Sequence, residues 1–196
     1  MDWCFYSGSK YIEIVETYIA LLKGINVGGH KKVLMTELRE LLTNSGFINV
    51  RTYIQSGNVI LESSKKNKTE IESEIQKAIF SQFGFEVSVL VRTRDDLKRM
   101  FSSCPFSEEK KKSSYFMLLN DVPNEDLVKI ASEKVYEDED YYVVDDCIYF
   151  FCEKGYGRAK FNVNFFERIL QTFATARNYN TMVKLIAMSL ENEKGH

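Results

Sequence analysis

Two short polar segments in the first half of the chain hold the residue types best suited to chemistry. Residues 24–32, Gly-Ile-Asn-Val-Gly-Gly-His-Lys-Lys, are glycine-rich and basic, and residues 55–58, Gln-Ser-Gly-Asn, carry three polar side chains. Exposed backbone N–H groups and lysine ammonium groups suit an oxyanion such as phosphate. The residues we expect to contact a ligand are Asn26, Gly28, Gly29, Lys31, Gln55, Ser56 and Asn58. The alternative is a purely structural loop and turn, in which Asn26 holds a left-handed backbone position.

The glycine-rich loop does not match the P-loop of nucleotide-binding proteins. Gly24-x-x-x-x-Gly29 is followed by His30, where the P-loop pattern requires lysine and then serine or threonine. The helix expected after the loop also begins several residues beyond the glycines, so its dipole is not directed at them. What remains for this loop is a general anion site.

A third polar segment, residues 175–181 (Thr-Ala-Arg-Asn-Tyr-Asn-Thr), precedes an apolar helix. Asn180 or Thr181 is expected to cap that helix, because both side chains can accept a hydrogen bond from its first backbone N–H groups. Capping does not account for Arg177 and Asn178 as well. We therefore expect Arg177, Asn178 and Asn180 to form a second set of ligand contacts, with capping alone as the alternative.

Histidine is scarce, which excludes most metalloenzyme and triad chemistry. The two histidines are His30, in the glycine-rich loop, and His196, the last residue. The sequence has no G-x-S-x-G and no H-E-x-x-H motif, and one internal histidine does not make a Ser/His/Asp set. His30 has a side chain suited to a general base at neutral pH, but a lone loop histidine is more often simply exposed. No catalytic residue, metal site or cofactor is predicted.

Cysteine usage and the hydrophobic pattern indicate a cytoplasmic protein. The four cysteines include no C-x-x-C pair, so neither a zinc site nor a disulfide framework is expected. Buried free thiols are the expected state. Apolar runs such as Tyr18–Leu22 are far shorter than the ~18 residues of a membrane span, so no membrane partner is predicted.

Charge is unevenly distributed along the chain. The net charge is −2, yet residues 121–146 hold ten acidic and two basic residues, so this segment carries −8 and the rest carries +6. A solvated acidic loop is expected there in preference to a cation site. The positive remainder leaves nucleic acid as a possible partner, but residues 58–62 lack the aromatic side chains on which ferredoxin-like RNA binders stack bases.

The hydrophobic pattern of the first half predicts the element order βαββαβ. The expected strands are residues 18–23, 50–54, 58–62 and 87–91, and helices are expected to begin near Thr36, at the capping pair Thr69-x-x-Glu72, and at Thr93. In this order the first two strands run parallel, with the third between them. The glycine-rich loop and the 55–58 turn should therefore lie at the same end of the sheet.

The second half repeats this pattern faintly. Tyr115-Phe-Met-Leu-Leu matches Tyr18-Ile-Ala-Leu-Leu, and a helix, a hairpin through Asp145-Asp146 and a further helix follow in the same order. A last helix over residues 181–190 is expected where the first half has its fourth strand. The sequence thus predicts an α+β fold of two tandem ferredoxin-like (βαββαβ) subdomains, the second modified with a C-terminal helix in place of the last strand.

The expected domain organisation follows from this pattern. Residues 1–16 form a peripheral N-terminal extension and residues 17–101 the first subdomain. Residues 102–114 are polar, charged and hold Pro105, one of only two prolines, which is typical of a linker. Residues 115–191 form the second subdomain with the C-terminal helix.

Three long motifs resemble the bacterial "domain of unknown function 1697" family. They are residues 18–29 (Tyr-Ile-Ala-Leu-Leu-Lys-Gly-Ile-Asn-Val-Gly-Gly), 52–59 (Thr-Tyr-Ile-Gln-Ser-Gly-Asn-Val) and 175–181, and the similarity runs from about Tyr18 to Leu190. The resemblance implies a cytoplasmic α+β protein for which no activity, substrate or cofactor is established. It selects the same three segments as the residue chemistry does.

We therefore expect a binding protein for an anionic, phosphate-bearing small molecule or a nucleotide. Backbone amides and lysine would hold the anion, while side-chain amides and the serine hydroxyl would orient it. Two alternatives remain open: a metal-independent enzyme acting on such a substrate, and a nucleic-acid-binding module.

Overall fold

The computed structural model describes residues 15–193, which form an α+β fold. Two four-stranded antiparallel sheets and seven α-helices are present in this part of the chain. The peripheral extension expected over residues 1–16 lies outside the described residues, except for Val15 and Glu16.

The first half has the element order expected from the sequence. Its sheet has the strand order β2-β3-β1-β4, and β1 and β2 both pair antiparallel with β3, so they run parallel to each other. The elements are β1 (Glu16–Leu22), α1 (Met35–Asn44), β2 (Ile48–Tyr53), β3 (Asn58–Ser63), α2 (Lys68–Phe83), β4 (Val89–Thr93) and α3 (Arg94–Ser102).

The second half repeats that order. Its sheet has the strand order β6-β7-β5-β8, and α4 (Glu108–Lys112), within the expected linker, precedes it. The remaining elements are β5 (Tyr115–Leu119), α5 (Glu125–Ser132), β6 (Glu139–Val144), β7 (Cys147–Cys152), a short 3-10 turn (Tyr156–Arg158), α6 (Val163–Leu170), β8 (Ala174–Asn178) and α7 (Tyr179–Glu193).

The expectation that a C-terminal helix replaces the fourth strand is wrong. Residues 174–178 form β8, which pairs antiparallel with β5 from Leu119↔Ala174 to Tyr115↔Asn178, and α7 follows it. Residues 174–178 were not predicted as a strand because several of them are polar. Arg177 is buried in it because neutral oxygens surround its guanidinium group, so the segment lacks the apolar alternation that marks an ordinary strand.

Capping residues fix where the helices begin. The expected Thr93 capping box is present, with the Thr93 hydroxyl accepting from Asp96 N at 3.2 Å and Asp96 Oδ2 accepting from Thr93 N at 2.9 Å. Helix α2 is capped instead by Asn67, two residues before the expected Thr69. Helix α7 is capped by Asn178, whose Oδ1 accepts from Thr181 N at 2.9 Å, and not by Asn180 or Thr181.

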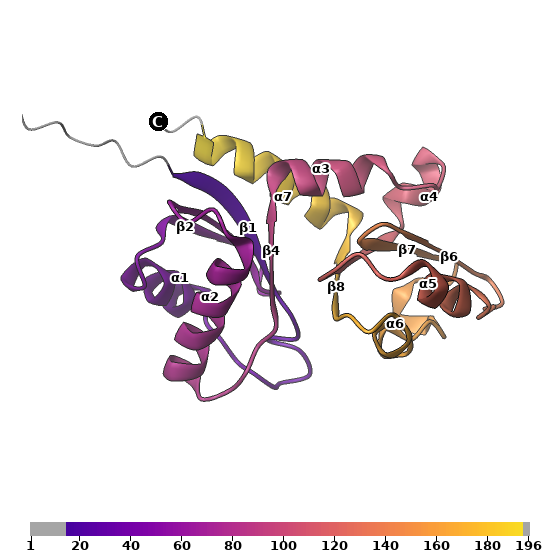
Figure 1. Cartoon of the computed structure of the whole chain (residues 1–196), viewed down its shortest axis with the longest axis horizontal. Coiled ribbons are helices and arrows are strands. Elements are labelled where there is room, and N and C mark those ends of the chain that lie inside the picture. The colour runs from indigo at the N-terminus through magenta and orange to yellow at the C-terminus, as the bar shows by residue number, and fades with distance from the viewer. Residues whose placement is uncertain (1–14, 194–196) are drawn as a thin grey trace, which may run out of the picture.

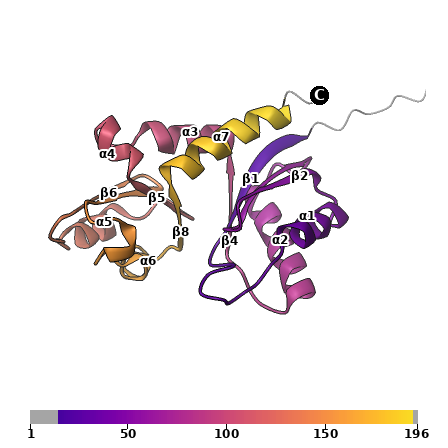
Figure 2. The same cartoon turned by 180° about the vertical axis from the view of Figure 1, so that it is seen from behind.

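Three apolar clusters fill the space between the sheets and the helices. Helices α1 and α2 cover one face of the first sheet, and α5 and α6 cover one face of the second (Figure 1). The middle cluster joins the remaining faces of both sheets to α3 and α7. Figure 2 shows α7 running from β8 back across the first half, where Arg51 of β2 pairs with Glu191 at 2.7 Å.

Strand registers make residues of the two halves equivalent. In the first half Ile19 lies opposite Arg92, and in the second half Phe116 lies opposite Arg177. The matching backbone hydrogen bonds Leu22 N to Gly57 O (2.8 Å) and Leu119 N to Asp146 O (2.9 Å) make Gly57 the counterpart of Asp146. The middle cluster follows the same relation, with the pairs Ile19/Phe116, Leu21/Leu118, Ile60/Tyr149, Leu97/Met182 and Met100/Leu185.

The cysteines within residues 15–193 are free thiols. Cys147 and Cys152 lie on opposite faces of β7, one in the middle cluster and one in the outer cluster of the second half, as their spacing predicts. None of the helices in the described residues has the length and apolar character needed to cross a membrane.

Candidate functional site

Asn26 ties the glycine-rich loop to the β2–β3 hairpin. Its Nδ2 donates to Val33 O and to Gln55 O, both at 2.9 Å, and its Oδ1 accepts from Val33 N at 2.9 Å. These bonds hold Asn26 at φ +56, the left-handed conformation expected from the sequence. The two segments therefore meet at one end of the first sheet.

Unusual backbone conformations are concentrated in these two segments. Of the fourteen residues with positive φ in the described part of the chain, seven lie here: Gly24, Asn26, Gly28, Gly29, Lys31, Ile54 and Gly57. Ile54 is β-branched and exposed, so its φ of +48 carries strain that the surrounding structure must hold. Gly57 is required because an added Cβ would lie 2.7 Å from Leu22 Cβ.

Arg177 joins the third segment to the other two. It is only 7 % exposed, and its Nε donates to Asn58 Oδ1. The rest of the guanidinium group donates to five further oxygens: Thr175 Oγ1 (2.8 Å), Ala176 O (2.8 Å), Ser56 O (3.2 Å), Leu22 O (3.3 Å) and Gly57 O (3.3 Å). All six acceptors are neutral. Burial lowers the pKa of Arg177 to about 10, so the group stays charged at neutral pH.

The other residues expected at the site occupy different environments. Asn58 is fully buried and donates to Tyr53 O and Ser56 Oγ, whereas Gln55 and Ser56 are exposed. Asn178 caps α7, and Asn180 is exposed on its first turn. The glycine-rich loop carries the exposed residues Gly28, Gly29, His30 and Lys31.

A hollow of about 700 Å³ opens beside the glycine-rich loop. Three lysines line it: Lys23 at the end of β1, Lys31 in the loop, and Lys77 on α2. We call it the lysine hollow, and its remaining lining residues are Gly24, Gln76, Phe80, Glu86, Val87 and Ser88. Lys31 Nζ donates to Glu86 O at 2.7 Å, so this lysine is held across the hollow.

Sequence reasoning missed most of this lining. A topological signal was present, because β4 runs antiparallel to β1 and must begin where β1 ends. It follows that residues 86–88 and the end of α2 must lie beside Lys23 and the glycine-rich loop.

Lys23 also contacts the second half. Its Nζ forms an ion pair with Glu167 Oε1 of α6, and both side chains are partly buried. The same Glu167 oxygen accepts from Ala174 N at 2.5 Å. The carboxylate is therefore fixed at the start of β8 while it neutralises one lysine of the hollow.

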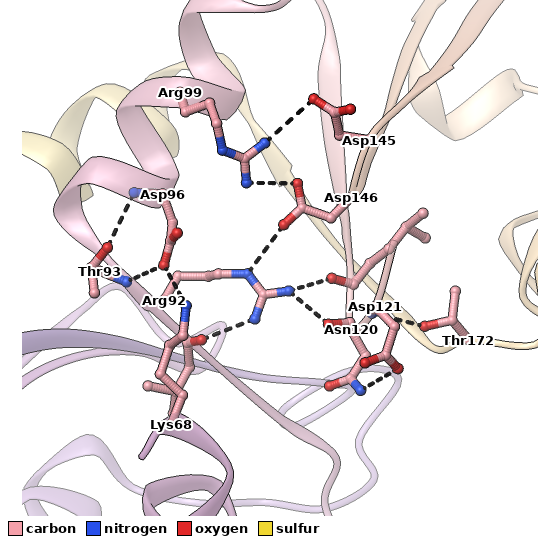
Figure 3. Close-up of polar contacts among 12 residues, drawn as sticks. Lys68, Arg92, Thr93, Asp96, Arg99, Asn120, Asp121, Asp145, Asp146 and Thr172 are labelled. Atoms are coloured by element: carbon pink, nitrogen blue, oxygen red, sulfur yellow. Dashed lines mark hydrogen bonds and ion pairs between the residues drawn. The ribbon is translucent and has the colours of Figure 1, made fainter. Parts of the chain in front are cut away.

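Arg92 forms the corresponding link at the other junction (Figure 3). It is 6 % exposed and donates to Leu119 O at 2.5 Å and Asn120 O at 2.9 Å, while its Nε lies 3.7 Å from Asp146 Oδ2. Asp146 Oδ1 accepts from Arg99 at 2.8 Å. Asp146 is thus buried between two arginines and is not part of the solvated acidic loop expected from the sequence.

A smaller hollow of about 290 Å³ adjoins Arg92 and carries charges of both signs. Glu72 of α2 lines it and accepts from Val91 N at 2.8 Å. Burial raises the pKa of Glu72, an effect that the nearby Arg92 charge partly offsets. Lys68, which also lines it, pairs with Asp96 at 2.9 Å (Figure 3).

Residues 15–193 contain no group of three histidine, cysteine or acidic side chains arranged to hold a metal ion. Burial raises the pKa of the Cys147 thiol, which keeps it from acting as a thiolate nucleophile. The lysine hollow and the glycine-rich loop offer a ligand lysine ammonium groups and exposed backbone.

Comparison with known proteins gives a family. The sequence model described as "Protein of unknown function (DUF1697)" matches residues 15–149. No curated protein matches the chain. Among solved structures, the conserved bacterial protein SP0830 from Streptococcus pneumoniae is similar, with a TM-score of 0.71 and 27 % identity over 90 % of this chain and 99 % of that one. The chain therefore belongs to the DUF1697 family of proteins of unknown function.

Proposed function

We propose that this protein binds a small anionic molecule bearing phosphate, and that the anion occupies the lysine hollow. The observation that carries the proposal is the meeting of Lys23, Lys31 and Lys77 in one hollow whose lining includes a single carboxylate, that of Glu86. Three positive charges around a shared space repel one another, and an anion placed between them relieves that repulsion.

The remaining lining suits the rest of a small molecule. Phe80, which is 54 % exposed, and Val87 both line the hollow, so it has apolar surface as well as charged groups. Gln76 and Ser88 supply hydrogen-bond donors and acceptors. A volume of about 700 Å³ falls in the usual range for sites that bind small molecules.

Four of the residues expected from the sequence have one of two roles in this proposal. Lys31 contacts the anion directly, beside Gly24, which was not among the expected contacts and leaves the backbone accessible at φ +71. Asn26, Asn58 and Arg177 fix the loop, the hairpin and β8 relative to one another, so they shape the hollow without lining it.

Titration with inorganic phosphate and pyrophosphate, followed by calorimetry, tests the proposal. Lys31→Asn removes a charge at φ +46 with a residue that tolerates this conformation, and Lys77→Gln removes one from an exposed helix face. Each should weaken pyrophosphate binding by about tenfold, the effect of losing one charge-assisted contact. Lys98→Gln, on the exposed face of α3 and outside the hollow, is the matched control and should bind as the wild type does.

Two results would overturn this function. One is that neither phosphate nor pyrophosphate binds the wild type. The other is that Lys98→Gln weakens binding as much as Lys31→Asn and Lys77→Gln, since the attraction would then be a property of the whole surface.

We also propose that each half is a ferredoxin-like subdomain and that the protein is cytoplasmic. The strand orders β2-β3-β1-β4 and β6-β7-β5-β8 support the first proposal, because both follow the βαββαβ arrangement. Free thiols at Cys104, Cys147 and Cys152 support the second, since exported proteins more often pair their cysteines.

A further inference from the structure

The ammonium group of Lys23 is placed to interact either with Glu167 or with an anion in the lysine hollow. It lines the lysine hollow, and it is paired with Glu167 from the second half, 144 residues away in the sequence. An anion in the hollow would need the same charge that Glu167 neutralises. Within residues 15–193, neither Lys31 nor Lys77 forms an ion pair with a carboxylate of the second half.

We infer that Glu167 is an internal competitor of the ligand, so that anion binding in the hollow is coupled to the contact between the two halves. This inference rests on the proposed function. Glu167 stays in place when Lys23 leaves it, because Ala174 N still donates to the same carboxylate oxygen. Lys23 has a flexible side chain and is the partner that moves.

The coupling extends beyond the ion pair because Lys23 directly follows a point where the halves meet. Leu22 O accepts from Arg177, and Leu22 N donates to Gly57 O at 2.8 Å. Withdrawing Lys23 from Glu167 therefore removes one of the charged links at this junction. By thermodynamic reciprocity, whatever loosens the Lys23–Glu167 contact must strengthen anion binding by the same factor.

The test compares pyrophosphate affinity in five forms of the full-length chain. Glu167→Gln keeps an acceptor for Ala174 N but removes the competing charge, and we expect it to bind pyrophosphate about threefold more tightly than the wild type, as expected for release of a partly exposed ion pair. Glu191→Gln makes the same charge change in an ion pair outside the hollow, with Arg51, and should leave the affinity unchanged. In the Lys23→Met background the Glu167→Gln substitution should have no effect, which isolates the pair.

A second measurement uses the unaltered chain. Backbone hydrogen exchange across α6 should rise when pyrophosphate is saturating, because the bound anion withdraws Lys23 from Glu167. Exchange elsewhere on the second half, such as in α5, serves as the internal reference.

The possible failures are distinguishable. If the wild type binds pyrophosphate but Glu167→Gln has the same affinity, the competition is absent while the binding function stands. If Glu167→Gln gains equally with and without Lys23, the gain is a general charge effect and the inference is wrong. If no form binds pyrophosphate, the proposed function fails and the competition fails with it.

Discussion

Arg177 and Arg92 occupy equivalent positions in the two halves, yet the surroundings of their charges differ. Each lies on the fourth strand of its own sheet and donates to the end of the first strand of the other half, to Leu22 O and Leu119 O respectively. Arg92 also has the carboxylate of Asp146, whereas all the acceptors of Arg177 are neutral.

The reason for the difference is steric. The counterpart of Asp146 is Gly57, where any Cβ would collide with Leu22, so a carboxylate cannot be placed there. The charge of Arg177 therefore remains unneutralised beside the glycine-rich loop, and it adds to the positive potential of the lysine hollow. The arginine charge is neutralised at the Arg92 junction. At the Arg177 junction it is not, and this junction lies on the side where we propose that an anion binds.

The largest expected effect is that of Arg177→Met. This change removes the donor of six oxygens, four of them in buried hydrogen bonds, and the free energy of unfolding should fall by about 4 kcal/mol in urea denaturation. Arg168→Met, on the exposed face of α6, should change it by less than about 0.5 kcal/mol. A loss below about 1 kcal/mol for Arg177→Met would mean that its neutral contacts do not stabilise the junction.

Gly57→Ala tests the steric origin of the asymmetry. Gly57 and Gly84 have nearly the same φ, +74 and +75, but an added Cβ meets Leu22 at the first and nothing within 4 Å at the second. Thermal unfolding should show a loss of about 3 kcal/mol for Gly57→Ala and about 1 kcal/mol for Gly84→Ala, where only backbone strain applies. Equal losses would remove the steric argument.

Asp146→Asn makes the Arg92 junction resemble the Arg177 junction. The amide keeps an acceptor for Arg99 but leaves Arg92 without a carboxylate, so the free energy of unfolding should fall by about 2 kcal/mol. Asp145→Asn, the exposed neighbour, is the control and should have an effect of less than about 0.5 kcal/mol. If both variants are as stable as the wild type, Arg92 needs its carboxylate no more than Arg177 does.

The smallest expected effect concerns Glu72, in the hollow beside Arg92. Folding raises the pKa of Glu72 above the unfolded value of 4.5, so the folded state favours the protonated carboxyl, and wild-type stability falls as pH rises through the folded pKa. Glu72→Gln should therefore be more stable than the wild type at pH 7. Solvent screening of this partly exposed group keeps the gain below about 1 kcal/mol.

Urea denaturation at two pH values measures this gain. The difference between Glu72→Gln and the wild type should disappear below about pH 4, where Glu72 is protonated in both states. Glu40→Gln, on the exposed face of α1, should show no comparable gain. A gain for Glu72→Gln that is the same at both pH values would show that burial of its charge is not the cause.

Local signals in the sequence were sufficient to predict the order of helices and strands in the first half. The apolar periodicity and turn residues gave its element order, and the Thr93 capping box formed as expected. The convergence of the glycine-rich loop and the hairpin followed from topology, and the Asn26 bond to Gln55 O confirms it. These features depend on residues close in the chain or on one simple sheet order.

Long-range partners decided what could not be predicted. Residues 174–178 form a strand because Arg177 is satisfied by oxygens from residues such as Ser56, about 120 positions away. Asp146 was expected to lie in a solvated loop, but in the structure it is buried beside Arg92 and Arg99 of the first half. In both cases a polar residue is buried by contacts with residues far away in the chain, which a local sequence pattern cannot predict.

The position of α7 has a consequence for how the chain is made. Met182, Leu185 and Met188 complete the middle cluster, which also contains Ile19 and Ile60 from the first sheet. This helix follows the other described elements in the chain, so the inner face of the first sheet lacks part of its apolar cover until residues 179–188 have been synthesised. A chain that stops before residue 179 would therefore expose part of that apolar face, which favours aggregation.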